Sequence, residues 1–375
     1  MRVIISAGGT GGHIYPALSI CDALKKIDPF VEILYIGTTD RMEGDIVPRH
    51  KINFYGIKAR GLDRKFSLKN IKSLYYLVSS YIETRNVIKK FMPDIVIGVG
   101  GYVTAPVIMA AHSLKVKTLI HEQNSVLGLT NRFLSKYVDC VCTSFKDTVV
   151  DAKKVIYTGN PCGEYVKYKF DKKELDLTPS KKLVLIVMGS LGSQTVTNHL
   201  KNILSKFNDK KYEVLIATGN NYYECFKDMQ YKNVKVVPFI DNIKKIFDKV
   251  DIMVTRAGAT TISEIISYKV PSILVPSPYV TDNHQYKNAY ALVNNNAAVL
   301  LEEDKLESSL VSTIDSLIGD SEKILAFNMG EGNIPKIEQG SIDTTDLQSE
   351  IVNIMEGGKD AFDRRKTIYN TWRIQ

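Results

Sequence analysis

A histidine directly follows a glycine-rich run close to the start of the chain. The run is Gly8-Gly9-Thr10-Gly11-Gly12, and His13 comes after it. Glycines let a backbone approach a ligand closely, and the N–H groups at a helix start attract anions. The run therefore predicts a phosphate-binding turn that leads into a helix beginning near Pro16. A tight turn with positive φ is the alternative, although it needs fewer glycines.

Two further glycine-rich turns follow apolar segments. One is Gly98-Val99-Gly100-Gly101-Tyr102, and the other is Gly189-Ser190-Leu191-Gly192-Ser193, in which both serines can donate to phosphate oxygens. The spacings match neither the P-loop nor the dinucleotide fingerprint G-x-G-x-x-G, which disfavours nucleotide hydrolysis and NAD binding. Three such turns predict two phosphorylated ligands that meet in one cleft.

The segments around these turns alternate between short, β-branched-rich runs and stretches of helical period, which predicts βα units and parallel sheets. The first series of predicted strands is 2–5, 32–36, 94–98, 118–121 and 140–143. The second series is 183–188, 212–217, 234–238, 251–255 and 272–275. The glycine-rich turns fall at the carboxyl ends of strands, where α/β sheets bind ligands. We expect an α/β protein with two Rossmann-like α/β/α domains facing across a cleft.

Length and composition agree with two domains. The chain has 375 residues, more than the roughly 250–300 at which one core usually divides. Its 44% hydrophobic and 24% charged residues are typical of globular proteins. Gly159-Asn160-Pro161 and the lysine-rich stretch to about residue 182 predict a connection between domains. We expect one domain at 1–160, another at 161–343, and a helix at about 344–375 that packs back on the first.

The five cysteines include no C-x-x-C pair and no zinc spacing, which favours a reducing compartment. No apolar core of a signal peptide follows the first residues, and no window of about 18 apolar residues could span a membrane.

A basic stretch stands out within the overall charge of +8, because residues 51–91 hold ten Lys or Arg against two acids. Apolar residues recur there at helical spacing, while Lys65, Lys69 and Lys72 take other faces. The apolar residues are Leu68, Ile71, Leu74, Tyr75, Val78 and Ile82. Such a helix can rest on an anionic membrane. An ordinary helix packed on the sheet is the alternative, and nucleic acid is disfavoured because no reading motif accompanies the charge.

Taken together, the motifs resemble those of the MurG family in order and spacing over roughly residues 1–305. They are 8–13, 100–102, 121–124 (His-Glu-Gln-Asn), 159–161, 189–193, 256–259 (Arg-Ala-Gly-Ala) and 282–285 (Asp-Asn-His-Gln). Members of this family have the GT-B fold. They transfer N-acetylglucosamine from its UDP form to undecaprenyl-diphosphate-linked N-acetylmuramoyl pentapeptide, which converts lipid I to lipid II for peptidoglycan at the cytoplasmic face of the membrane.

The resemblance implies a role for each matching residue. Those expected to bind the lipid-linked acceptor are Gly9, Thr10, Gly11, Gly12, Gly100, Gly101, Tyr102 and Asn124. Those expected to bind the UDP-sugar donor are Gly189, Ser190, Gly192, Ser193, Ile240 at the uracil, Ala259, Glu264 at the ribose and Gln285 at the sugar. Lys65, Lys69, Lys72, Leu74 and Tyr75 are expected at the membrane.

The sequence departs from the family at three places. Gly163 replaces a common arginine that contacts the donor phosphate, and Met188 replaces a glycine of the third turn. The match fades beyond about residue 320. These departures leave a non-catalytic, regulatory binding protein as one alternative.

The family is inverting, so a single displacement with a catalytic base is expected. His13 is the first candidate for the base, since an ordinary imidazole titrates near neutral pH, and Glu122 is the second. His13 could instead cap its own loop, and Thr261-x-x-Glu264 could be a capping box. No Asp-x-Asp metal motif occurs, so we expect no metal or cofactor, with the helix start after Gly189–Ser193 stabilising the leaving diphosphate.

Other enzymes could share this architecture. One is a transferase that glycosylates diacylglycerol or another polyprenyl carrier, and another is a UDP-N-acetylglucosamine 2-epimerase, which needs no acceptor. The expected partners are UDP-N-acetylglucosamine, the lipid-linked muramoyl peptide, an anionic membrane surface and cell-wall assembly proteins, without nucleic acid.

Overall fold

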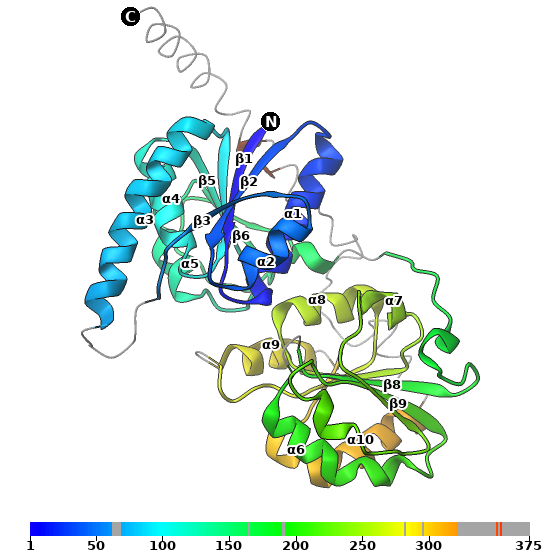
Figure 1. Ribbon diagram of the computed structural model, residues 1–375. Coiled ribbons are helices and arrows are strands. Elements are labelled where there is room, and N and C mark those ends of the chain that lie inside the picture. The colour runs from blue at the N-terminus through cyan, green and yellow to red at the C-terminus, as the bar shows by residue number, and fades with distance from the viewer. Residues whose placement is uncertain are drawn as a thin grey trace, which may run out of the picture. The chain divides into compact units, whose positions relative to one another are not determined.

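A computed structural model describes residues 1–61, 69–163, 166–189, 192–280, 283–294, 296–320, 350–351 and 353–354 (Figure 1). Contacts within the chain divide it into two compact units. The first comprises Met1–Cys162 and Ile342–Gln375, and the second comprises Gly163–Ser341.

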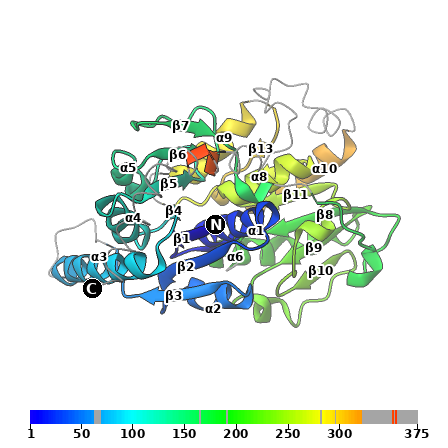
Figure 2. The ribbon, with the colours of Figure 1, turned by 90° about the horizontal axis from the view of Figure 1, so that it is seen from above.

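The first unit is built on a parallel sheet of seven strands in the order β3-β2-β1-β4-β5-β6-β7 (Figure 2). The strands are β1 (Arg2–Ala7), β2 (Glu32–Thr38), β3 (Asn53–Ile57), β4 (Ile95–Gly100), β5 (Lys117–Glu122), β6 (Cys140–Thr143) and β7 (Val155–Tyr157). The helices are α1 (Gly11–Ile27), α2 (Met42–Arg49), α3 (Lys69–Phe91), α4 (Thr104–Ser113) and α5 (Leu129–Leu134). The strand order reverses between β1 and β4, which makes the carboxyl ends of these strands the expected ligand site.

Both faces of this sheet are buried, which is why its strands are almost continuously apolar. On one face Val3 and Ile5 of β1 pack with Ile14 and Ala17 of α1. On the other face Ile4 packs with residues of α3, α4 and α5. Figure 1 shows α1 and α2 on one side of the sheet and α3, α4 and α5 on the other.

The second unit repeats this plan with the order β10-β9-β8-β11-β12-β13. Its strands are β8 (Lys182–Val187), β9 (Tyr212–Ala217), β10 (Val234–Val237), β11 (Ile252–Thr255), β12 (Ser272–Leu274) and β13 (Val299–Leu300). Its helices are α6 (Gln194–Ile203), α7 (Lys244–Phe247), α8 (Ala259–Tyr268), α9 (His284–Val293) and α10 (Leu306–Gly319). The strand order of this sheet reverses between β8 and β11. Two doubly wound domains are therefore confirmed.

The sequence-based prediction was wrong about where the first helix begins. Helix α1 starts at Gly11, so Gly11 and Gly12 form its first turn and Pro16 lies inside it. Proline has no N–H, and its fixed φ suits the early part of a helix, where few backbone bonds are lost. Strands β3, β7 and β13 were not predicted, because Asn53–Ile57 carries a glycine and the other two have only three and two residues.

Residues near the end of the chain belong to the first unit. Ile351 is buried in the core formed by β1, β4 and α1, and Glu350 pairs with Lys154 Nζ at 2.6 Å. The helix predicted for about 344–375 lies otherwise outside the described residues.

Candidate functional site

The first two glycine-rich turns touch each other at the carboxyl ends of β1 and β4. The Gly8 N–H donates to the Gly100 carbonyl at 3.2 Å. Gly101 has a φ of +87°, and a Cβ there would lie 2.3 Å from the Gly8 oxygen. Only glycine allows this close approach, so the two turns form one continuous surface at the reversal point.

His13 lies against this surface from the first turn of α1. Its Nδ1 is 3.1 Å from the Gly8 carbonyl oxygen and 3.5 Å from Thr10 Oγ1. A Cβ on Gly100 would lie 2.7 Å from the ring, so Gly100 leaves the space that the imidazole fills. Because a carbonyl only accepts, Nδ1 carries the proton, and the lone pair of the neutral ring is on Nε2. This tautomer suits a base that acts through Nε2.

The other residues predicted for the acceptor gather around His13. Gly11 and Gly12 stand in the first turn of α1, where backbone N–H groups lack a carbonyl four residues earlier in the helix, and Thr10 is its exposed N-cap. The Tyr102 ring lies close to Gly9, as a Cβ there would be 3.8 Å from Cε1. The Gly9 N–H, however, turns inward and donates to Glu43 Oε2 at 3.1 Å.

Glu43 is a residue that the sequence analysis missed. It lies in the first turn of α2 and is completely buried beneath the Gly8–Gly9 turn. Its second oxygen accepts from the Thr38 N–H at 3.2 Å and from Thr38 Oγ1 at 2.5 Å. A glutamate between Met42 and Gly44 carries no periodic or motif signal, so only the fold reveals it.

Glu122, the second candidate for the base, uses its carboxylate to shape the loop after β5. One oxygen accepts from the backbone and side-chain N–H groups of Asn124 at 3.0 and 3.1 Å. The other accepts from the Gly128 N–H at 3.0 Å and Asn131 Nδ2 at 2.8 Å. Four donors saturate a carboxylate, which makes Glu122 a poorer base than His13.

His121 is fully buried beside this loop. Its Nε2 donates to the Gly159 carbonyl at 2.9 Å, and its Nδ1 accepts from Gln123 Nε2 at 3.0 Å. Burial lowers the pKa of His121 to about 4, so the ring is neutral. The histidine therefore ties β5 to the Gly159-Asn160-Pro161 segment, close to the boundary between the units.

In the second unit, the third glycine-rich turn leads into α6. Gly189 and Gly192 both have positive φ, and Ser193 caps the helix by accepting from the Val196 N–H at 3.5 Å. A Cβ on Gly192 would lie 2.0 Å from the Thr218 oxygen, so the turn packs tightly on the end of β9. Ser190, predicted at the diphosphate, lies outside the described residues.

Arg256, which the sequence analysis noted only as part of a motif, lies at this helix start and is ion-paired with Glu303. Its Nη2 donates to Ser193 Oγ at 2.9 Å and contacts Glu303, and Nη1 donates to the Val275 carbonyl. Ser193 Oγ thus accepts two hydrogen bonds. Its own proton can be donated to Thr195 Oγ1, 3.1 Å away, or to a ligand.

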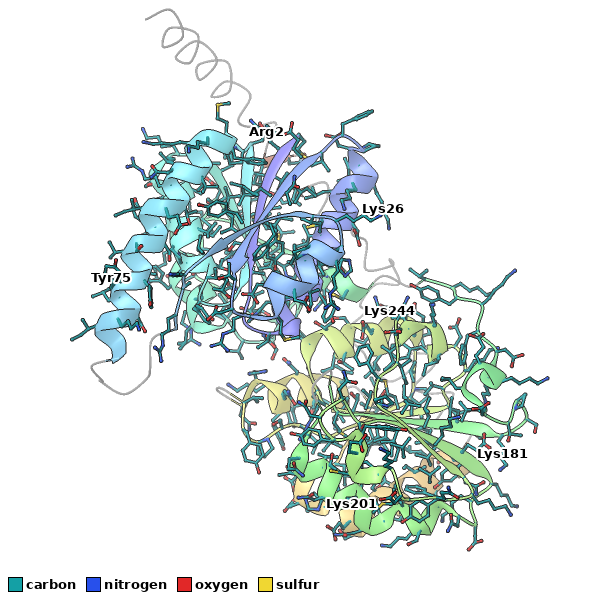
Figure 3. The ribbon with its side chains drawn as sticks, in the orientation of Figure 1. Arg2, Lys26, Tyr75, Lys181, Lys201 and Lys244 are labelled. Atoms are coloured by element: carbon teal, nitrogen blue, oxygen red, sulfur yellow. The ribbon has the colours of Figure 1, made fainter. Side chains whose placement is uncertain are left out.

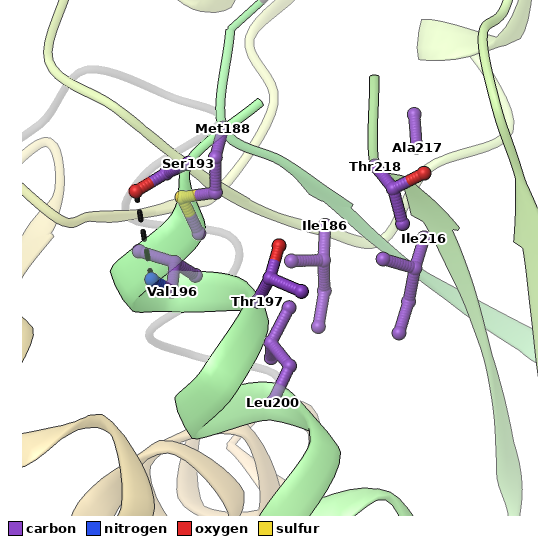
Figure 4. Close-up of a pocket in the computed structure, with 9 residues that line it drawn as sticks. All are labelled: Ile186, Met188, Ser193, Val196, Thr197, Leu200, Ile216, Ala217 and Thr218. Atoms are coloured by element: carbon purple, nitrogen blue, oxygen red, sulfur yellow. Dashed lines mark hydrogen bonds between the residues drawn. The ribbon is translucent and has the colours of Figure 1, made fainter. Parts of the chain in front are cut away.

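Met188 does not alter the exposed face of the turn. Its side chain is 7% exposed and packs into the core between β8 and α6. Figure 4 shows it beside Ser193, Val196 and Thr197, where it borders a small cavity of about 10 Å³. A side chain at this position is therefore accommodated inward.

Glu264 lies in the middle of α8, and the capping-box interpretation was wrong. Gly258 is the N-cap of α8, so Glu264 stands well beyond the first turn. Its carboxylate is largely buried, and its only partner in the part of the chain that the structure describes is Lys244 Nζ at 3.8 Å. Burial raises the pKa of Glu264 to about 7, although Lys244 opposes the shift. This carboxylate is poorly satisfied compared with Glu43 and Glu122, so it can accept bonds from a ligand.

The remaining donor-side predictions lie at the same end of the second sheet. Ala259 begins α8 directly after β11, and Gln285 in α9 accepts from the Ser277 N–H at 2.9 Å. Ile240 follows β10 and is partly buried. Each of these residues follows the carboxyl end of a strand, as expected for a ligand site.

Helix α3 turns its apolar side outward. Its exposed residues follow one stripe and are 52–68% exposed, namely Ile71, Leu74, Tyr75, Val78 and Ile82. The side packed on the unit carries Ser73 and Ser80, which donate to the carbonyls of Gly61 and Lys58. Tyr75 projects away from the sheet (Figure 3), and Lys72 is exposed near it. These five apolar residues therefore do not pack on the sheet, although α3 itself packs on the unit through other residues such as the buried Ile88.

Two of the predicted membrane lysines cannot be placed. Lys65, with Leu68, lies outside the described residues, and nothing is described of the Lys69 side chain. Within the described ranges, no helix is long and apolar enough to cross a membrane. Nor do the described residues include three metal-ligating side chains in one group.

Comparisons with known proteins agree with this architecture. The signature of the glycosyltransferase family 28 N-terminal domain matches residues 3–143, and that of its C-terminal domain matches residues 183–357. A protein of Listeria welshimeri is 44% identical over 339 residues, which cover 87% of this chain and 93% of that protein. Its name is UDP-N-acetylglucosamine–N-acetylmuramyl-(pentapeptide) pyrophosphoryl-undecaprenol N-acetylglucosamine transferase. The chain belongs to the MurG family of glycosyltransferases.

Other MurG-family proteins and structures extend the match. A protein of Bacillus cereus with the same activity in its name is 41% identical and covers 89% of this chain and 95% of its own. The crystal structure of Acinetobacter baumannii MurG has a TM-score of 0.71 at 25% identity and covers 93% of this chain and 99% of that one. The structure of a putative UDP-N-acetylglucosamine 2-epimerase from Listeria monocytogenes has a TM-score of 0.64 at 12% identity. The match covers 94% of this chain and 97% of the epimerase chain, so the two share the fold.

Proposed function

We propose that this MurG-family chain transfers N-acetylglucosamine from UDP-N-acetylglucosamine to the N-acetylmuramoyl pentapeptide carried on pyrophosphoryl-undecaprenol, the step from lipid I to lipid II. The observation that carries the proposal is 44% identity, over 87% of the chain, to a protein named for this transfer. The glycine-rich helix starts of the two units support it, since each substrate contains a diphosphate.

The two units divide the substrates in this proposal. The first unit binds the acceptor diphosphate at the start of α1, with Thr10, Gly11, Gly12, Tyr102 and the Gly100–Gly101 turn around it. The second unit binds the donor. Glu264 accepts from the ribose hydroxyls, and Ser193 with the start of α6 faces the diphosphate.

The chemical step is one displacement. His13 Nε2 takes the proton of the acceptor hydroxyl as its oxygen forms a bond to the anomeric carbon of the donor sugar. The bond from that carbon to the diphosphate oxygen breaks, and UDP leaves with the electron pair. The α6 start stabilises the charge that develops on the diphosphate, and Arg256, which is paired with Glu303, holds Ser193 in place there.

The acceptor's lipid explains the outward-facing stripe of α3. We propose that Ile71, Leu74, Tyr75, Val78 and Ile82 enter the headgroup layer of an anionic membrane, with Lys72 at its surface. An exposed apolar stripe of this kind, on a helix that already packs on the unit through Ser73, Ser80 and Ile88, is unusual for a protein surrounded by water. A peripheral position on the membrane brings the first unit to the lipid-linked substrate.

The transfer is tested with the purified chain, UDP-N-acetylglucosamine and a short-chain lipid-linked muramoyl peptide. We expect product that contains both sugars, and UDP release that requires the acceptor. Turnover of UDP-N-acetylglucosamine without acceptor would instead favour a 2-epimerase. His13→Ala should lower kcat by about 100-fold or more, as for a general base, while donor affinity is retained.

Membrane binding is tested by sedimentation with vesicles that contain anionic lipid. Replacing both Leu74 and Tyr75 with serine should abolish binding, and high salt should weaken that of the wild type. Val149→Ser is the matched control, because Val149 is 91% exposed on the same unit but lies outside α3. Equal binding by both variants would contradict the assignment of α3.

A further inference from the structure

We propose that Glu43 sets the tautomer and orientation of His13 through the Gly8–Gly9 peptide unit. Glu43 is then a positioning residue, since it acts on the histidine without touching a substrate. The inference rests on the proposed function, in which His13 accepts the proton of the acceptor hydroxyl.

The first half of the connection runs from the carboxylate to the backbone. Glu43 Oε2 accepts from the Gly9 N–H at 3.1 Å, while Oε1 is held by two donors of Thr38. The glutamate is completely buried, and a Cβ on Gly8 would lie 2.2 Å from Oε1. The carboxylate and the turn therefore pack directly against each other, and neither can rotate without losing hydrogen bonds.

The second half runs from the backbone to the histidine. The Gly9 N–H and the Gly8 carbonyl belong to one planar peptide unit, and in a trans unit they point in opposite directions. With the N–H directed to Glu43, the carbonyl points to the other side, where His13 Nδ1 lies 3.1 Å from its oxygen. Hydrogen bonds thus connect the Glu43 carboxylate to the Gly8–Gly9 peptide unit, and that unit to the His13 imidazole.

This chain of bonds has a chemical consequence for His13. The carbonyl requires a proton on Nδ1, which leaves the basic lone pair on Nε2. A carboxylate bonded to the N–H polarises the peptide and makes its carbonyl a stronger acceptor. Glu43 thus favours the tautomer that the transfer needs and stabilises the imidazolium that forms when Nε2 takes the proton.

A simpler role for Glu43 would be to join α2 to the turn. Burying a carboxylate is expensive even when it is bonded, and an uncharged side chain could join the same elements. Among the described residues, Tyr35 of β2 interacts electrostatically with Glu43, and Cys21 of α1 interacts with Tyr35. Burial raises the pKa of both, so they stay neutral around pH 7. Neither group therefore places a second charge beside the Glu43 carboxylate.

Nuclear magnetic resonance of the wild-type protein tests the connection without a substitution. At a pH at which the His13 ring is neutral, its ¹⁵N shifts should report a proton on Nδ1 and an unprotonated Nε2. The Gly9 amide proton should resonate downfield, as expected for a bond to a carboxylate. A proton on Nε2 in the neutral ring would overturn the proposal.

The Glu43→Gln variant tests the dependence on charge. If its amide oxygen stays with Thr38, its NH₂ faces the Gly9 N–H, which then has no acceptor. We expect a mixture of His13 tautomers, kcat lowered by about tenfold or more, and little change in KM for UDP-N-acetylglucosamine. The control is Asp45→Asn, which removes one charge from the same helix where Asp45 is exposed and bonded to Arg49.

The outcomes separate this inference from the proposed function. If His13→Ala keeps full turnover, the role of His13 as base fails, whatever the ring tautomer is. If His13 is essential but Glu43→Gln leaves both its tautomer and kcat unchanged, the positioning role of Glu43 fails alone. If Glu43→Gln does not fold, the wild-type ring shifts decide.

Discussion

If Glu264 binds the donor ribose as proposed, donor binding should depend on pH near neutrality. Its pKa is raised to about 7 by burial, against the partial opposition of Lys244. A carboxylate that accepts from two ribose hydroxyls must be ionised, because the protonated form is itself a donor. The affinity for UDP-N-acetylglucosamine should therefore fall as the pH falls through 7.

The size of the effect follows from the ionised fraction of Glu264. With a pKa of about 7, roughly nine tenths of the protein is ionised at about pH 8 and one tenth at about pH 6. If only the ionised form binds the ribose well, Kd increases about tenfold between these values. That change corresponds to about 1.4 kcal/mol.

Isothermal titration calorimetry at a series of pH values measures this dependence. UDP-N-acetylglucosamine is the suitable ligand, because both its phosphates are esterified and its charge does not change in this range. Glu264→Gln is the control, since it keeps the shape of the side chain and removes the titration. We expect the variant to bind weakly and with a flat pH profile.

The same substitution should have the opposite effect on the unliganded fold. The folded-state pKa of Glu264 lies above the ordinary value of 4.5, so the folded protein loses stability as the pH rises between 4.5 and about 7. Above that window the cost is about 3 kcal/mol, which Glu264→Gln removes. A wild-type Kd that is constant between pH 6 and 8, or a variant that melts lower than wild type at pH 8, would refute the reasoning.

Three other predictions concern groups around the first glycine-rich turns. The pKa of His121 is lowered to about 4 in the folded protein, so as the pH falls the unfolded state binds a proton at this residue before the folded state does. The free energy of unfolding should therefore fall by about 2 kcal/mol between pH 7 and 5 in denaturant titrations. It should fall less in His121→Gln. Gly101→Ala should destabilise the protein by about 1–3 kcal/mol more than Gly189→Ala, because both residues have positive φ but only the first Cβ meets an atom, the Gly8 oxygen at 2.3 Å. Glu122→Gln should lower the melting temperature, with a loss of about 1–3 kcal/mol in the free energy of unfolding. It should lower kcat less than His13→Ala does. A larger loss of kcat in Glu122→Gln than in His13→Ala would identify Glu122 as the base.

Apolar runs predicted most of the fold because parallel strands are buried on both faces. Segments such as Val3–Ile5 and Leu183–Ile186 have no polar alternation and could only be internal strands. The glycine-rich turns were recognisable for a related reason, since close backbone contacts such as that of Gly101 with Gly8 exclude any Cβ. Strands and turns whose residues are fixed by burial or by steric contact could therefore be predicted from the sequence.

Contacts between residues far apart in the chain could not be predicted from the sequence. Glu43 and Gly9 lie far apart in sequence, and the bonds of Arg256 to Ser193 and Glu303 join three separate loops. The amphipathic period of α3 was predicted, but periodicity does not tell which side faces the sheet. Only the structure shows that the stripe is exposed, while Ser73, Ser80 and Ile88 face the rest of the unit.

The burial of Ile351 has a consequence for synthesis on the ribosome. Ile351 completes the hydrophobic core around β1, although all strands of that sheet precede the second unit in the chain. We therefore expect that the first unit cannot complete its core during synthesis, and that part of this core stays exposed to water, until residues near 351 have been translated. A fragment that ends after β7 should consequently recruit chaperones or aggregate, and a peptide that contains residues 342–375 should rescue it in trans.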